Sequence, residues 1–183
     1  LFTAWLVLSG FGFSSRAPQA WDDWAQSNVN DGREIDHSAW SALLGRYIKQ
    51  GKARLNTFAY GKVSASDKLA LKNYIASLEA IEVTSYNRNE QLAYWITLYN
   101  AATVNVVLAH YPVKTIRDID ISGFLANGPW QKELIEVEGT PLTLDDIEHA
   151  ILRPIWKDPR IHYGVNCASV GCPNLQSTAF SGK

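Results

Sequence analysis

The feature that most constrains the fold is a stretch of eighteen residues without a charge, Leu92 to Ala109. A cap-like Asn89 precedes it and Pro112 blocks its continuation, so one helix is predicted from about Asn89 to about His110. Its length would suit a membrane span. Two asparagines inside the stretch, and the amphipathic segments before it, favour instead a central helix buried on nearly all sides. We therefore expect no membrane span in the mature domain.

Polar side chains inside such a helix need hydrogen-bond partners, because an unpaired buried polar group costs free energy. Asn100 lies on the same helix face as Ile96 and Thr103, so we expect it to be buried and bonded to one specific group. Glu90 stands in the first turn, where a carboxylate interacts favourably with the helix dipole. The central helix is thus also a source of candidate site residues.

Two amphipathic helices are predicted before the central one. The first is capped by His37 or Ser38 and runs to about residue 49, and the second covers about residues 64–80. His37 is expected to be a solvated cap residue. The apolar stripe of the second helix is expected to consist of Leu69, Leu71, Tyr74, Ile75 and Leu78.

The C-terminal half mixes both kinds of element. The segment "ELIEVEG" (133–139) predicts a strand, and a capping box of Thr143 and Asp146 opens a helix that Pro154 should end. In "RIHYGVN" (160–166) apolar and polar residues alternate, as in a half-buried strand. The chain is therefore predicted to be α+β, with a helical N-terminal half and a small β-sheet in the C-terminal half.

The first twenty residues have the character of a secretory signal. An apolar run from Leu1 to Phe13 is followed by small residues around Ala17. We expect a signal peptide over residues 1–20 with its start missing, and a single domain over residues 21–183 that is truncated at its C-terminus. Export would place the domain in the bacterial periplasm or outside the cell, an oxidising environment that favours disulfides.

The composition narrows the classes of partner. The chain has 17 basic and 18 acidic residues, a net charge of −1, and no cluster of Lys and Arg. Nucleic acid is therefore not expected as a partner. No cofactor motif is present, and we expect no cofactor. Seven tryptophans and eight tyrosines suggest a groove but not what fills it. The expected partner is an unidentified peptide-like or small-molecule substrate.

The only two cysteines, Cys167 and Cys172, stand in "NCASVGC" and allow three interpretations. They can form a disulfide in an exported, non-catalytic binding domain. Cys167 can be a nucleophile. Together with His149 and His162 they can bind zinc, although no paired CxxC or HExxH motif supports this. The residues alone leave these alternatives open.

The nucleophile hypothesis assigns a role to each polar residue. Asn166 would cap a short helical turn that begins at Cys167 and lowers the pKa of its thiol. His149 would be the general base, held by Asn100 or Asp145, as in a papain- or transglutaminase-like site with another chain order. His162 and Glu90 are second-tier candidates. Such a site would perform acyl transfer, namely amide or thioester hydrolysis or transpeptidation.

Three segments in this order, "EQLAYWITLYNAATVNVVL", "PLTLDDIEHAILRP" and "DPRIHYGVNCASVGCPNL", resemble the DUF547 family over about residues 85–180. The resemblance implies a domain found in exported bacterial proteins and, in plants, attached to coiled-coil segments. It also implies that the thiol at the Cys167 position is kept in relatives with Ser at the Cys172 position. The leading hypothesis is therefore a thiol-dependent acyl-transfer enzyme with Cys167 as nucleophile, and the disulfide-held binding domain and the zinc site are its alternatives. No reaction is established for the family, so the resemblance supplies no mechanism.

Overall fold

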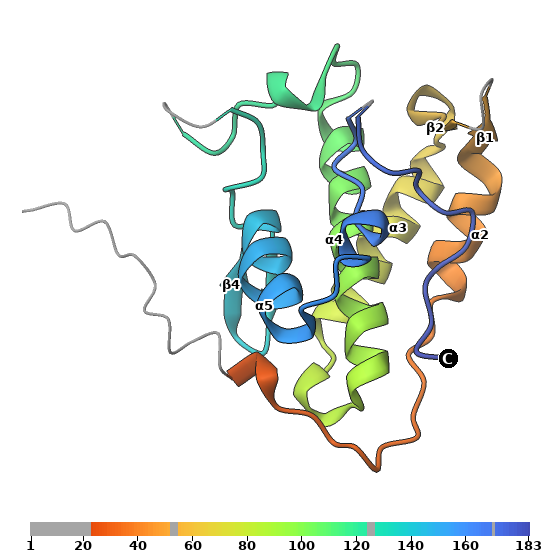
Figure 1. Ribbon diagram of the computed structural model, residues 1–183. Coiled ribbons are helices and arrows are strands. Elements are labelled where there is room, and N and C mark those ends of the chain that lie inside the picture. Colours follow the sequence, from red (N-terminus) through yellow and green to blue (C-terminus); the bar gives the residue numbers. More distant parts are fainter. Residues whose placement is uncertain (1–22, 52–54, 124–126, 170) are drawn as a thin grey trace, which may run out of the picture.

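The computed structural model describes residues 23–51, 55–123, 127–169 and 171–183, so the expected signal peptide lies outside the described residues. The fold is built around one long helix, α4 (Arg88–His110). The helix α3 (Ala65–Glu79) packs against α4, and α2 (Ser38–Tyr47) packs against α3. A π-helix (Asp146–Leu152) packs on α4 from another side and continues into α5 (Arg153–Trp156). Figure 1 shows α4 between these two groups of helices.

The central helix is buried as predicted. Seventeen of its 23 residues are buried. By length and composition α4 could also cross a membrane, but 83% of its most apolar window is covered by the rest of the fold. Asn87 caps it, accepting hydrogen bonds from the backbone N–H groups of Asn89 and Glu90. The cap therefore lies two residues before the predicted Asn89.

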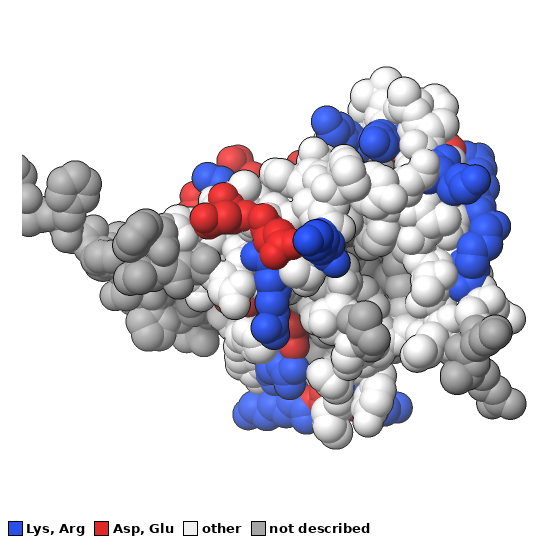
Figure 2. All heavy atoms as spheres, turned by 90° about the horizontal axis from the view of Figure 1, so that it is seen from above, with Lys and Arg blue, Asp and Glu red and all other residues white. Residues whose placement is uncertain are grey.

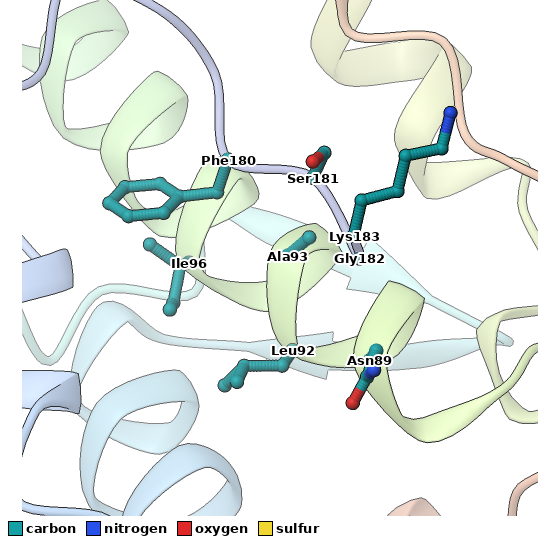
Figure 3. A pocket seen from close by; sticks show the side chains of 8 residues that line it. All are labelled: Asn89, Leu92, Ala93, Ile96, Phe180, Ser181, Gly182 and Lys183. Carbon is teal, nitrogen blue, oxygen red and sulfur yellow. The ribbon is translucent and has the colours of Figure 1, made fainter.

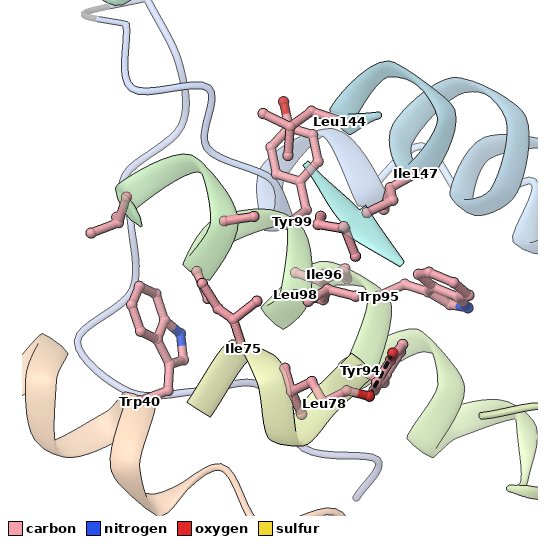
Figure 4. Packing of buried hydrophobic residues seen from close by; sticks show 14 of the residues in the cluster. Trp40, Ile75, Leu78, Tyr94, Trp95, Ile96, Leu98, Tyr99, Leu144 and Ile147 are labelled. Atoms are coloured by element: carbon pink, nitrogen blue, oxygen red, sulfur yellow. Dashed lines mark hydrogen bonds between the residues drawn. The ribbon is translucent and has the colours of Figure 1, made fainter. Parts of the chain in front are cut away.

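The core consists of large side chains from α2, α3 and α4 and from the segment after β4. Trp95 and Tyr94 of α4 are fully buried and meet edge to face. The Tyr94 hydroxyl donates to the carbonyl of Leu78 at 3.0 Å, which satisfies its polar end (Figure 4). Burying one such side chain contributes about 1.5–3 kcal/mol. Leu69, predicted for the core stripe of α3, is instead 59% exposed.

The strands form two short antiparallel hairpins. The predicted strand at 133–139 is found as β3 (Ile135–Val137), and it pairs with β4 (Thr140–Leu142). A second hairpin, β1 (Ile48–Gln50) with β2 (Asn56–Phe58), replaces the end of the first predicted helix. The described fold is α+β, with α4 as its centre.

Four short 3₁₀ turns lie among the described elements: Asp23–Ala25, Tyr60–Lys62, Val83–Ser85 and Ile116–Asp118.

The strand predicted at 160–166 is wrong. That segment contains a helical turn, α6 (Ile161–Gly164). Ile161 and Val165 are buried while Tyr163 is 68% exposed, which is the spacing of one helical turn. Asp158 starts the turn by accepting from the backbone N–H of Arg160.

The capping box before the π-helix is confirmed. Asp146 N–H donates to Thr143 Oγ1, and Thr143 N–H donates to the Asp146 carboxylate. Pro154 does not end this helix as predicted. It lies in the first turn of α5, where the missing N–H of a proline is tolerated.

His37 is not solvated as predicted; it is only 7% exposed, with Nδ1 2.5 Å from the Tyr74 hydroxyl. Burial lowers the pKa of His37 below 6.5, although the charges of Glu90 and Asp36 oppose this shift. The unfolded chain therefore binds a proton at His37 more readily than the folded chain does. Above pH 6.5, the pKa of the unfolded chain, the stabilising contribution of the neutral buried ring is complete. It is lost as the pH falls through the lower pKa of the folded chain.

The burial of the His37 ring predicts that the fold loses stability in acid. We expect the free energy of unfolding in urea to fall more steeply from about pH 7 to about pH 5 in the wild type than in His37→Gln. Gln has no proton to gain in this range, so the variant is the matched control. Equal slopes for the two chains would contradict the prediction.

The charged side chains do not form one continuous surface. Seen from above, acidic and basic groups mix on one side of the molecule (Figure 2). Lys and Arg line the opposite edge, with a wide uncharged surface between the two. The expectation that nucleic acid is not a partner stays a prediction.

Candidate functional site

Asn100 joins α4 to the segment before the cysteines. Its side chain is 2% exposed. Its Nδ2 donates to the carbonyl of Gly164 at 2.8 Å, and its Oδ1 accepts from the backbone N–H of Asn166 at 2.8 Å. The prediction that Asn100 is buried and specifically bonded is confirmed. Its partners are backbone groups, and in this structure it holds the chain on either side of Val165.

The two cysteines are joined by a disulfide, with their Cα atoms 6.2 Å apart. The helical turn predicted at Cys167 is wrong. The Asn166 side chain accepts from Ala168 N–H, and its Nδ2 donates to the Pro173 carbonyl at 2.6 Å. Ala168 lies in the left-handed region with φ 57°, so the chain turns where the predicted helix would have begun.

His149 and Asp145 lie on the other side of the fold from α2, in and just before the π-helix. His149 is exposed, and it is close enough to Asp145 for their charges to interact. Burial raises the pKa of Asp145 above its usual value, while His149 and a hydrogen bond with Gln131 partly offset this. The predicted base therefore has an acidic neighbour one turn away.

Glu90 holds two distant segments at the start of α4. The side chain is 5% exposed. One carboxylate oxygen accepts from Ile35 N–H at 3.2 Å, and the other accepts from Gly182 N–H at 3.1 Å. A Cβ at Gly182 would lie 2.8 Å from the Glu90 backbone nitrogen, so only glycine fits this approach. Glu90 thus joins the N-terminal and C-terminal parts of the described chain.

The remaining candidates do not assemble into a metal site. His162 is exposed, and its ring lies edge to face with the Tyr163 ring at 5.6 Å. Among the described residues, no group of three or more His, Cys, Asp or Glu side chains is arranged to hold a metal ion. The zinc alternative also needs two thiolates, whereas both sulfurs are bonded to each other here.

A groove that the sequence analysis did not locate runs beside α4. It has a volume of about 530 Å³, within the range of ligand-binding clefts. Its apolar lining comes from α4, α6 and the C-terminal segment, namely Leu92, Ile96, Ile161, Tyr163, Gly164 and Phe180. Asp158, Arg160, Gln176 and Lys183 supply polar groups. We call this the α4 groove.

A smaller hollow of about 250 Å³ extends the α4 groove toward the start of the helix. The two share Leu92, Ile96, Phe180 and Lys183. In Figure 3 the Phe180 ring of the C-terminal segment faces Ile96, and Leu92 and Asn89 lie on α4 farther along. The sequence offered no clear signal for this groove, because Tyr163 fits the apolar alternation of residues 160–166 and its exposure is seen only in the structure.

Asn100 also forms part of the support of this groove. Gly164, whose carbonyl Asn100 holds, is a lining residue. A Cβ at Gly164 would lie 3.0 Å from Ile96 Cδ1, so α6 approaches α4 closely at that point. Asn100, one of the predicted catalytic residues, therefore helps to fix one wall of the groove.

The disulfide should stabilise the fold modestly, because the two cysteines that it joins are only five positions apart in the sequence. Loop entropy predicts a loss of about 2 kcal/mol in the free energy of unfolding on reduction. Urea unfolding with and without reductant measures this. The reductant should not change the free energy of unfolding of the variant Cys167→Ser/Cys172→Ser. A wild type whose free energy of unfolding is also unchanged by the reductant would contradict the prediction.

Comparison with known proteins gives one match. Residues 83–183 match the family described as "Protein of unknown function, DUF547". The matched region contains α4, both cysteines, Asn100 and the α4 groove. No curated protein and no solved structure matches the chain.

Proposed function

The chain belongs to the DUF547 family, and from this premise we propose that it is an exported, non-catalytic binding domain. The observation that carries the proposal is that the Asn100 side chain is fully engaged in holding the backbone. Both of its polar atoms bond the backbone on either side of Val165, next to the α4 groove. Cys167 is engaged in a disulfide. Asn100 thus supports one wall of the groove, and the disulfide suits an oxidising compartment such as the periplasm.

The lining favours a peptide-like ligand. Leu92, Ile96 and Phe180 offer an apolar floor for one side chain. Gln176 both donates and accepts hydrogen bonds, while Asp158 accepts them. A peptide backbone presents the complementary N–H and C=O groups. Tyr163, 68% exposed at the groove, adds an aromatic surface of the kind enriched at binding sites.

Selection from a display library of heptapeptides on the immobilised, oxidised protein tests binding. Enriched peptides should lose about tenfold or more in affinity for Tyr163→Ala. Tyr111→Ala is the matched control, because Tyr111 is 47% exposed and does not line the groove. Failure to enrich peptides, or equal losses in both variants, would contradict the proposal.

A second candidate is thiol-dependent acyl transfer, with Cys167 as nucleophile and His149 as base. It is favoured by the position of Asp145, which lies close enough to His149 for the imidazole to lower the pKa of the Asp145 carboxyl, as expected of an orienting carboxylate. This function requires the reduced state, because a disulfide sulfur is not a free nucleophile.

Iodoacetamide near pH 6 separates the two functions when the intact mass is measured. The binding domain predicts no adduct before reduction and two slowly formed adducts after it. The enzyme predicts one fast adduct on Cys167 after reduction, and its loss in His149→Ala. His162→Ala, which changes another exposed histidine, is the control and should keep the fast reaction.

A further inference from the structure

The two cysteines of the disulfide have different surroundings. A hollow of about 110 Å³ lies beside the cysteine loop, and Cys172 is one of its lining residues whereas Cys167 is not. Liquid water occupies about 30 Å³ per molecule, so the hollow admits a group of a few heavy atoms. The thiol arm of a small molecule has this size.

The wall of this hollow is polar and uncharged. Besides Cys172 and Pro173, it consists of Leu55, Asn56, Thr57, Asn166, Ser169 and Asn174. Asn174 accepts from the backbone N–H of Asn56 at 2.9 Å, so β2 and the cysteine loop form the two sides. None of the described residues that line the hollow carries a charge, so none of them repels an anionic thiolate. Amide and hydroxyl groups suit a peptidic thiol.

We propose that Cys172 is the sulfur at which an external, low-molecular-weight peptidic thiol opens the disulfide. The thiolate attacks Cys172 Sγ and forms a mixed disulfide with it. The bond to Cys167 breaks, and Cys167 Sγ leaves with the electron pair and takes a proton from solvent. A second thiol molecule can then attack the mixed disulfide, releasing the oxidised small molecule and leaving both cysteines reduced.

The opened loop keeps its attachment to the fold. The Asn166 side chain holds the Pro173 carbonyl across the base of the ring, and Asn56 Nδ2 donates to the Leu175 carbonyl at 3.0 Å. Neither bond involves the sulfurs. The first product is thus a folded chain modified at Cys172 with a free Cys167 thiol. This inference does not depend on the ligand of the α4 groove.

Reduced glutathione is the probe. The oxidised protein is treated briefly at mildly alkaline pH and quenched with acid, and the free thiol is blocked with N-ethylmaleimide before peptide mapping by mass spectrometry. Glutathione should be found on Cys172 at least about tenfold more often than on Cys167, because access selects the sulfur that is attacked. In urea, where the hollow is absent, the preference should disappear.

A pair of variants tests the hollow itself. Thr57→Trp should slow the opening about tenfold by filling it. Val29→Trp places the same side chain at a position that is 81% exposed and does not line the hollow, and it should leave the rate unchanged. Attack on Cys167, equal attack on both sulfurs, or reaction only in urea would each overturn the proposal.

Discussion

Replacing Asn100 with alanine is expected to lower the free energy of unfolding by about 2–4 kcal/mol. The side chain is 2% exposed and bonds the Gly164 carbonyl and the Asn166 N–H. Alanine would leave both backbone groups without these partners next to the core, and each unsatisfied group costs about 1–3 kcal/mol. Urea unfolding followed by circular dichroism measures the loss.

Asn105→Ala is the matched control, since Asn105 is on the same helix and only half-buried. Because Asn105 is partly open to solvent, its replacement should change stability by well under the loss at Asn100, about 1 kcal/mol or less. The pair of variants also bears on function. If Asn100 served only to orient a catalytic histidine, its loss would reduce activity and leave stability near that of Asn105→Ala, which would contradict the supporting role proposed here.

The second large effect is expected at Glu90. Glu90→Ala removes the acceptor of both Ile35 N–H and Gly182 N–H, and we expect the free energy of unfolding to fall by about 2–4 kcal/mol. Glu90→Gln keeps one carbonyl oxygen and should lose about half as much. Hydrogen exchange at the Ile35 and Gly182 amides should accelerate in both variants, because the released segments open locally.

Glu79→Ala is the comparison. Glu79 also accepts from a backbone N–H, that of Glu136 at 3.0 Å, but this bond is exposed to water. The loss there should be about 1 kcal/mol or less. A Glu90→Ala chain as stable as Glu79→Ala would mean that the N-terminal and C-terminal segments are held by other contacts.

A helix could be predicted where a long apolar stretch fits only a buried helix. The uncharged stretch at 92–109 defines α4, and the spacing of Ile96, Asn100 and Thr103 was sufficient to predict a buried Asn100. The segment 160–166 failed because a few alternating residues fit a strand and a single helical turn equally well. The β1–β2 hairpin was also missed, since its pairing depends on cross-strand contacts and not on a local pattern.

The candidate site was less predictable because asparagine has several local bonding modes. Asn166 could cap a helix. In the structure it lies in a turn instead, where its side-chain oxygen accepts from the backbone N–H of Ala168. The choice between these modes depends on tertiary partners, here Pro173 and Asn100. The same holds for His37, whose burial follows from Tyr74 on another helix. Such distant partners cannot be read from neighbouring residues.

The position of α4 in the chain order has a consequence for biosynthesis. On the ribosome α4 is complete at His110, before the π-helix, α6 and the C-terminal segment that cover it have been made. Translation of the intervening residues takes on the order of seconds. During that time the nascent chain carries a helix as apolar as a membrane span with part of its apolar surface still uncovered by the segments that bury it in the finished fold.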